Sequence, residues 1–157
     1  VAYADSNWAG DVTDCKSTSG FCMFLGDSLI SWKDLKQTVV AYSTAKSEYR
    51  AMAHATAEVV WFRYLPSDLG VPHSSPTSLY CDNRSVIQIA HNIVFHERTK
   101  HIEIDCHFVR QHLQSSSISL PFASSALQLA DFFTKTHTTA WFQFLLGKLS
   151  VFSAQTL

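Results

Sequence analysis

The first part of the chain carries apolar positions in short runs that are typical of β-strands. Residues 1–4 (VAYA) have the pattern of a strand end, and the turn-forming residues after them predict a loop that begins at Asp5. β-Branched and aromatic residues then form three further runs, at 20–25, 28–33 and 37–42. We therefore expect consecutive antiparallel strands here.

A helical pattern begins near Ser43. Residues 43–65 carry alanines and large apolar side chains nearly all round, with no glycine and no proline before Pro66. Ser43 or Thr44 suits the N-cap position. The pattern predicts a long, largely buried helix that Pro66 and Gly70 close.

Strand and helix patterns alternate in the rest of the chain. Residues 78–82 predict a short strand that ends in Asp82, and a helical repeat follows at once. The later runs predict a helix over 102–114, a strand over 118–122 and two helices over 126–135 and 139–149. This order predicts an α/β domain, with a mixed sheet that carries helices on its faces.

The composition fits one globular domain. The chain has 157 residues, 46% hydrophobic and 16% charged, with no run that suggests a disordered or membrane-spanning segment. The net charge of −1 argues against tight binding to nucleic acid, because strong binders usually carry a basic excess.

The cysteine pattern favours a reducing, intracellular location. The four cysteines form no CxxC pair, and their neighbours predict free, buried thiols rather than a disulfide framework. They are Cys15, Cys22, Cys81 and Cys106.

Four acidic residues stand where predicted strands and helices meet loops: Asp5, Glu48, Asp82 and Asp131. Three of them follow apolar runs, in VAYAD, SLYCD and LQLAD. A buried carboxylate is costly unless it is paired or binds a metal, so several that converge imply a cation. Carboxylate oxygens favour magnesium or manganese over zinc. Taken singly, however, each could be an exposed acid or a turn residue.

A zinc site is disfavoured. The histidines at 96, 101, 107 and 112 do not have a recognised ligand spacing. The four tryptophans are better explained as core or surface anchors than as platforms for stacked bases.

Several long motifs in a fixed order resemble the ribonuclease H domain of copia-type LTR-retrotransposon Pol polyproteins. They are YADSNWAGD, KSTSGFCMFLGDSLISWKDLKQTVVAYSTAKSEYRA, LYCDNRSVIQIAHNIVFHERTKHIEIDCHFVRQH and LQLADFFTK, which together cover nearly the whole chain. The resemblance implies a mixed five-stranded sheet, three antiparallel strands followed by parallel ones, with helices on both faces. It also implies that residues 1–157 are one domain, a C-terminal fragment of a longer polyprotein.

The resemblance places the family's catalytic, metal-binding acids on Asp5, Glu48, Asp82 and Asp131. It implies two Mg²⁺ ions, with Mn²⁺ as a substitute, and hydrolysis of the RNA strand of RNA–DNA hybrids during reverse transcription. The implied partners are the hybrid and the reverse transcriptase domain of the same polyprotein, without a membrane or a small-molecule cofactor. The implied location is a cytoplasmic retroelement particle or the nucleus.

Substrate contacts are expected from two groups of residues. Short polar groups near the metals would read the RNA 2′-hydroxyl, for which the candidates are Asn7, Ser43, Thr44, Asn83 and Arg84. The basic stretch HERTKH would contact phosphates through Arg98, Lys100 and His101, together with His96. Each residue could equally serve as a turn former, a helix cap or part of a solvated loop.

Some positions depart from the family pattern. Asn7 and Lys46 stand where an acidic residue is usual, Pro66 interrupts the long helix, and Thr136 replaces a common proline. These departures leave open a retroelement remnant that keeps the fold as a nucleic-acid- or protein-binding module with weakened or no catalysis. An integrase-like strand transferase fits less well, because its glutamate comes last among three acids and Glu48 comes second here.

Overall fold

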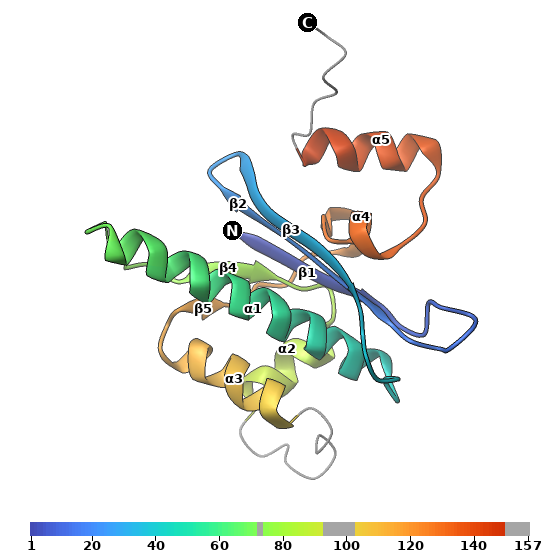
Figure 1. Cartoon of the computed structure of the whole chain (residues 1–157), viewed down its shortest axis with the longest axis horizontal. Coiled ribbons are helices and arrows are strands. Elements are labelled where there is room, and N and C mark those ends of the chain that lie inside the picture. The colour runs from blue at the N-terminus through green and yellow to red at the C-terminus, as the bar shows by residue number, and fades with distance from the viewer. Residues whose placement is uncertain (72–73, 93–102, 150–157) are drawn as a thin grey trace, which may run out of the picture.

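Five strands form one mixed sheet in the computed structural model, which describes residues 1–71, 74–92 and 103–149. The strand order is β3-β2-β1-β4-β5 (Figure 1). The strands are β1 (Ala2–Asn7), β2 (Thr18–Leu25), β3 (Ser28–Lys36), β4 (Thr77–Tyr80) and β5 (Ile118–Ser119). β1, β2 and β3 pair antiparallel, whereas β4 runs parallel to β1 and β5 runs parallel to β4. The predicted sheet type is therefore confirmed.

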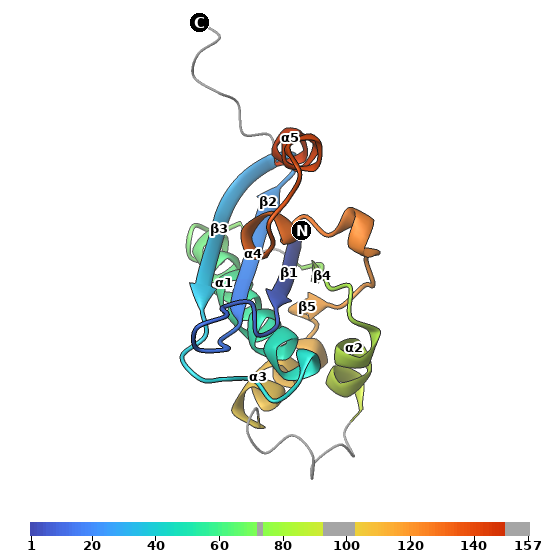
Figure 2. The same cartoon turned by 90° about the vertical axis from the view of Figure 1, so that its right-hand side faces the viewer.

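Helices cover both faces of the sheet. They are α1 (Thr44–Asp68), α2 (Arg84–His91), α3 (Glu103–Gln114), α4 (Asp131–Thr134) and α5 (Thr139–Lys148). Figure 2 shows α1 and α4 on opposite sides of the strands. Among the described residues, no helix is both long enough and apolar enough to cross a membrane.

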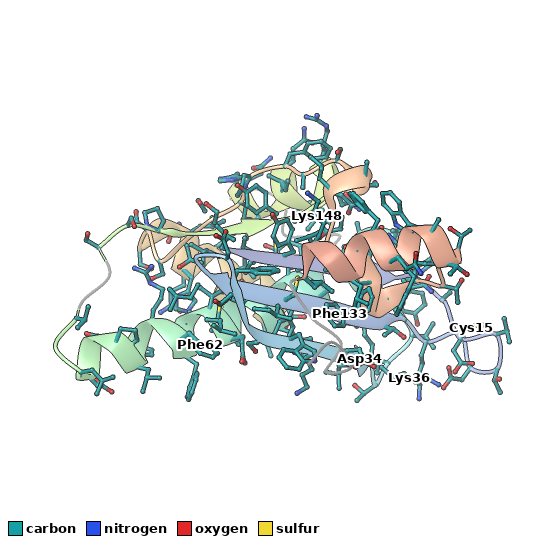
Figure 3. All side chains as sticks on the ribbon, turned by 90° about the horizontal axis from the view of Figure 1, so that it is seen from above. Cys15, Asp34, Lys36, Phe62, Phe133 and Lys148 are labelled. Atoms are coloured by element: carbon teal, nitrogen blue, oxygen red, sulfur yellow. The ribbon has the colours of Figure 1, made fainter. Side chains whose placement is uncertain are left out.

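The alternation of side chains along β2 produces two apolar clusters. Phe21 and Met23 pack toward α1 in the larger cluster, whereas Cys22 and Phe24 pack on the other face with Leu149. Figure 3 labels one ring beside each cluster, Phe62 on α1 and Phe133 on α4. The sheet is therefore buried on both faces at β2, whereas the edge strand β3 is largely exposed.

The long helix begins as predicted, but it does not end at Pro66. The Ser43 side chain accepts the backbone N–H of Lys46 as an N-cap, and the helix continues through Pro66 to Asp68. Pro66 has no N–H to donate to the carbonyl of Phe62, so the last turn lacks one hydrogen bond, and the helix ends two residues after the proline. Gly70, at a φ of +78°, then turns the chain out of the helix, as expected.

The strand predicted over 37–42 is wrong. The side chain of Gln37 is buried, and its amide nitrogen donates to Ser19 Oγ and to the carbonyl of Ser47, each at 2.9 Å. These bonds tie the chain to α1 directly after β3. Val39 and Val40 are exposed, so their β-propensity finds no strand partner.

The helix predicted over 126–135 is also wrong. A short 3₁₀ turn (Ser125–Leu127) and the one-turn α4 replace it. Between them, the buried amide of Gln128 donates to the carbonyl of Ala4 at 2.9 Å and accepts the N–H of Ala130 at 3.2 Å. This side chain takes the place of a helical hydrogen bond and fixes the segment to the sheet.

Two smaller expectations need correction. The strand predicted over 118–122 has only two residues, Ile118 and Ser119, followed by an isolated bridge between Phe122 and Cys81. The four thiols are free as expected, but Cys15 is exposed in the loop between β1 and β2 (Figure 3).

Candidate metal centre

Asp5 lies inside β1, so the loop predicted to begin there is wrong. β2 starts early, at Thr18, and pairs with the polar end of β1, where Asp5 lies opposite Gly20. The alternation of β1 directs Asp5 away from α1, because Ala2 and Ala4 pack on that side. The Asp5 side chain is fully buried at the centre of the sheet.

Three aspartates converge at this point. The carboxylates of Asp5, Asp82 and Asp131 each offer an oxygen, and these oxygens lie within 4.8 Å of one another. β1 and β4 are parallel neighbours, so their carboxyl ends lie at the same edge of the sheet and bring Asp82 beside Asp5. Asp131 joins them from the first residue of α4 on the second face. The fold therefore assembles acids that are far apart in the sequence.

Glu48 reaches the same place from α1. Its carboxylate lies within 4.8 Å of Asp82 and of the Cys81 sulfur. Burial, followed by the charges of Asp5 and Asp82, raises the pKa of Glu48 to about 9. The backbone N–H of Ser6 bonds to the carboxylate, but the buried Oε2 atom has no hydrogen-bond partner among the described residues. A buried oxygen without a partner is unusual and calls for a ligand.

Lys135 and Thr134 also enter the cluster, and neither was predicted from the sequence. The Lys135 ammonium lies 2.7 Å from Asp131 Oδ1 and 3.2 Å from Asp5 Oδ1, and the Thr134 hydroxyl donates to Asp5 Oδ2. One signal was available, because Lys135 follows Asp131 at the i,i+4 spacing at which helical side chains meet.

The lysine and the acids change one another's ionisation. Burial raises the pKa of Asp131 to about 6, although the hydrogen bond from Lys135 opposes that rise. Burial by itself lowers the pKa of Lys135, but the bond to Asp131 and the charge of Asp5 outweigh it and hold this pKa above its usual value. The ammonium therefore stays charged beside the acids at neutral pH.

The donor set fits a hard divalent cation. Four carboxylates supply oxygen ligands, which are the ligands that Mg²⁺ and Mn²⁺ prefer, and the unpartnered Glu48 Oε2 is available to such an ion. The adjacent Cys81 does not turn the site toward zinc. It is a single sulfur beside four carboxylates, and a set dominated by hard oxygen ligands favours Mg²⁺ or Mn²⁺ over zinc.

An open groove of about 640 Å³ adjoins the acids. Its lining includes Glu48, Asp82 and Lys135, and four of the predicted substrate contacts: Asn7, Thr44, Asn83 and Arg84. The groove is also lined by two exposed aromatic residues, Trp8 and Phe122, which were not predicted as site residues from the sequence.

Some of these contacts also have structural roles. The Asn83 side chain caps α2 by accepting the N–H of Val86, and Ser43 caps α1 outside the groove lining. The Arg84 guanidinium lies over the Phe122 ring, 3.8 Å from its centroid. The predicted phosphate contacts at 96, 98, 100 and 101 lie outside the described residues.

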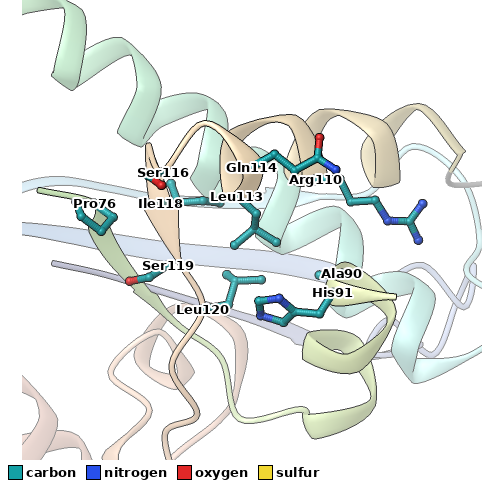
Figure 4. Close-up of a pocket in the computed structure, with 10 residues that line it drawn as sticks. All are labelled: Pro76, Ala90, His91, Arg110, Leu113, Gln114, Ser116, Ile118, Ser119 and Leu120. Carbon is teal, nitrogen blue, oxygen red and sulfur yellow. The ribbon is translucent and has the colours of Figure 1, made fainter. Parts of the chain in front are cut away.

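A separate cavity of about 450 Å³ lies between α2, α3 and β5 (Figure 4). Arg110 lines it and donates to the carbonyls of Ile89 and Asn92 at the end of α2, which is a structural role. None of the described residues that line this cavity is acidic.

Curated relatives match almost the whole chain, although no family model does. The retrovirus-related Pol polyprotein from transposon RE2 of Arabidopsis thaliana is 40% identical over 96% of this chain. The corresponding protein from transposon TNT 1-94 of Nicotiana tabacum is 33% identical over 85% of it. The chain spans 10% of the length of each of these relatives.

Solved structures show the same fold at low sequence identity. Ribonuclease H1 from Halobacterium salinarum has a TM-score of 0.56 and 14% identity, over 85% of this chain and 92% of its own. LC11-RNase H1 in complex with an RNA/DNA hybrid has a TM-score of 0.62 and 9% identity, over 85% and 91%. The prototype foamy virus protease-reverse transcriptase has a TM-score of 0.53 and 10% identity, over 95% of this chain and 20% of its own.

Proposed function

This chain is a homologue, with the ribonuclease H fold, of one segment of the retrovirus-related Pol polyproteins of transposons, and from that premise we propose that it hydrolyses the RNA strand of RNA–DNA hybrids. The observation that carries the proposal is the convergence of Asp5, Glu48, Asp82 and Asp131, with a buried Glu48 oxygen that lacks a partner. The fold alone would support binding as well as catalysis, whereas this cluster favours metal-dependent chemistry.

The four acids would hold two divalent ions, Mg²⁺ or Mn²⁺. Such ions activate a water molecule and stabilise the leaving oxygen of a phosphodiester. Asp5 would be the central ligand, because it is fully buried and the Thr134 hydroxyl orients its carboxylate. Asp82 is oriented in the same way by the Ser125 hydroxyl, which donates to it at 2.9 Å. Held side chains of this kind keep the ligand geometry fixed.

The adjoining groove would receive the hybrid. Asn7, Thr44 and Asn83 present short polar groups beside the acids, which suits recognition of a 2′-hydroxyl across the minor groove. Arg84 adds a positive charge near the same acids and would neutralise a phosphate. The solved LC11-RNase H1 complex, which contains an RNA/DNA hybrid, supports a hybrid as the ligand for this fold.

The relatives support a proposal for the partner of this chain. We propose that the chain acts beside the reverse transcriptase domain of the same polyprotein, since the matched segment is 10% of each Pol relative and the foamy virus neighbour carries a reverse transcriptase. Its place of action would be a cytoplasmic retroelement particle or the nucleus.

Cleavage of a hybrid tests the function. The purified chain should cut an end-labelled RNA strand paired with DNA when Mg²⁺ or Mn²⁺ is present, and EDTA should stop the reaction. Asp5→Asn and Asp82→Asn should each lower the rate by at least about a hundredfold, because each removes a metal ligand. Asp27→Asn, which changes an exposed aspartate in the turn between β2 and β3, is the matched control and should cleave normally.

The alternative is a fold that binds without cutting. One observation favours it: the Lys135 ammonium already neutralises part of the acid cluster. If the chain binds the hybrid but does not cleave it with either ion, this alternative replaces the proposed function.

A further inference from the structure

We propose that the Lys135 ammonium occupies one of the two cation positions of the acid cluster, so that the free protein holds one divalent ion tightly and takes a second only when the ammonium leaves. The inference rests on the proposed function, because it concerns the same site. It assigns to Lys135 the role of a positioning residue that sets how many metal ions are bound.

The ammonium sits where a cation between two acids would sit. It lies 2.7 Å from Asp131 Oδ1 and 3.2 Å from Asp5 Oδ1, so it bridges a strand of the sheet and α4. A divalent ion held by Asp5 and Asp131 would need the same two carboxylates that the ammonium contacts. The ammonium and such an ion would therefore compete for this position.

The other half of the cluster carries no such ammonium. The described ion pairs of Lys135 are to Asp5 and Asp131, and none of the described lysines or arginines forms an ion pair with Glu48 or Asp82. The Glu48 Oε2 atom is buried and unpartnered there. This asymmetry leaves the Glu48–Asp82 half open to the first divalent ion.

The backbone of Lys135 allows its side chain to leave. Lys135 is the C-cap of α4, where its N–H bonds to the Asp131 carbonyl at 3.0 Å and holds the backbone in place. Its side chain is 37% exposed and lines the open groove. A phosphate that entered the groove would attract the ammonium out of the acids, and the Asp5–Asp131 position would then accept a second ion.

Removal of the charge should therefore change metal binding without any nucleic acid present. The test is a Mn²⁺ titration of the whole chain, with free Mn²⁺ counted by electron paramagnetic resonance. Wild type should bind one ion tightly, and Lys135→Met should bind a second at least about tenfold more tightly than wild type does, because a unit charge beside a bound cation is costly. Lys135→Arg keeps the charge and should behave as wild type.

Controls separate a local effect from a general one. Lys33→Met, which removes an exposed lysine on β3 away from the acids, should leave Mn²⁺ binding unchanged. The thermal midpoints of all variants, measured in EDTA, establish that each is folded. If Lys135→Met is altered only in its folding, Lys135→Gln gives a second charge-free variant for the same titration.

The outcomes distinguish this inference from the proposed function. A second tight ion in Lys135→Met but not in Lys135→Arg supports the inference. Equal numbers of ions and equal affinities in wild type and Lys135→Met overturn it, while the cleavage of a hybrid by wild type would still uphold the function. If neither protein binds Mn²⁺ and wild type does not cleave, the proposed function fails and the inference fails with it.

Discussion

Glu48 is a carboxylic acid that the fold holds in a place unfavourable to its charge. It is buried, with 5% of its surface exposed, and lies close to Asp5 and Asp82. Burial and these neighbours raise its pKa to about 9, so in the metal-free protein Glu48 carries a proton at neutral pH. A divalent ion at the site would reverse this preference, because it stabilises the ionised form.

The stability of the metal-free protein should therefore fall as the pH rises. The Glu48 pKa is about 9 in the folded chain and near its ordinary value of 4.5 in the unfolded chain, so the unfolded state loses its proton first and gains stability. The loss begins above the unfolded pKa and is complete above the folded one. Between about pH 6.5 and about pH 9 in EDTA, the thermal midpoint should drop by roughly 3 °C or more.

Glu48→Gln isolates this effect. The variant keeps the size of the side chain but cannot ionise, so its midpoint should decline clearly less over the same range. Most of the titration of Asp131, whose pKa is about 6, lies below this range. A decline as steep in Glu48→Gln as in wild type would show that Glu48 is not the group responsible.

Gly20 shows how one element is seated against another. It lies on β2 opposite Asp5, and α4 packs directly over it. A Cβ atom at this position would lie 2.6 Å from Thr134 Cγ2, 2.9 Å from Phe133 Cβ and 3.2 Å from the carbonyl oxygen of Ala130. The absence of a side chain therefore lets α4 approach closely enough for Asp131 and Thr134 to reach Asp5.

Gly20→Ala should push α4 away from the sheet. We expect a loss of about 1–3 kcal/mol in the free energy of unfolding, as for other overpacked positions, and slower cleavage because Asp131 moves. Chemical denaturation and the hybrid assay measure the two effects. Gly147→Ala in α5 is the matched control: a Cβ there meets nothing within 4 Å, so stability should stay the same or rise. Equal effects of the two substitutions would contradict this account of Gly20.

Much of the fold could be predicted from the sequence, because most elements carry their own local signal. The cap at Ser43 and the apolar pattern predicted where α1 begins. The resemblance to the retrotransposon motifs implied a mixed five-stranded sheet with three antiparallel strands followed by parallel ones, which the topology and the solved structures confirm. The copia-type assignment within that group stays a prediction. The elements that were missed depend on side chains that bond across the sequence, such as Gln37 and Gln128.

Apolar runs before three of the acids made them candidates, but the resemblance to the retrotransposon motifs assigned all four, Glu48 included, to the site. Their convergence could not be derived from local pattern, since β1, α1, β4 and α4 meet only in the folded chain. Lys135 was missed for the same reason: it looks like a surface lysine until Asp5 and Asp131 are seen beside it.

The whole molecule buries three of its four thiols. Cys22, Cys81 and Cys106 are buried, whereas Cys15 is exposed. Burial raises the pKa of both Cys22 and Cys81 to about 12 and also raises that of Cys106, so these thiols are protonated as well as covered. Such thiols react slowly.

A thiol reagent should therefore label one cysteine in the folded protein. With dithionitrobenzoate near pH 8, we expect about one equivalent to react quickly in buffer and four in guanidinium chloride. Cys15→Ser should remove the fast equivalent. If two or more thiols react quickly in the folded chain, at least one of the thiols in the two apolar clusters is accessible to the reagent, which would contradict the burial described above.

The folded molecule places its acid cluster beside an open groove, and the net charge of the chain is −1. The chain therefore lacks the basic excess of strong nucleic-acid binders, and its selectivity would come from the groove and the metal ions rather than from charge. A hybrid should be its substrate, and a DNA duplex should not.

The most direct measurement follows both strands of one hybrid. RNA and DNA strands carry different labels and are incubated with the chain and Mn²⁺, beside a DNA duplex of the same sequence. If these four acids form a metal centre, wild type should cut the RNA strand and leave the DNA strand and the DNA duplex intact. Asp5→Asn should not cut the RNA strand. Two results would contradict this account of the metal centre: an RNA strand that wild type leaves intact, or an RNA strand that Asp5→Asn cuts as fast as wild type does.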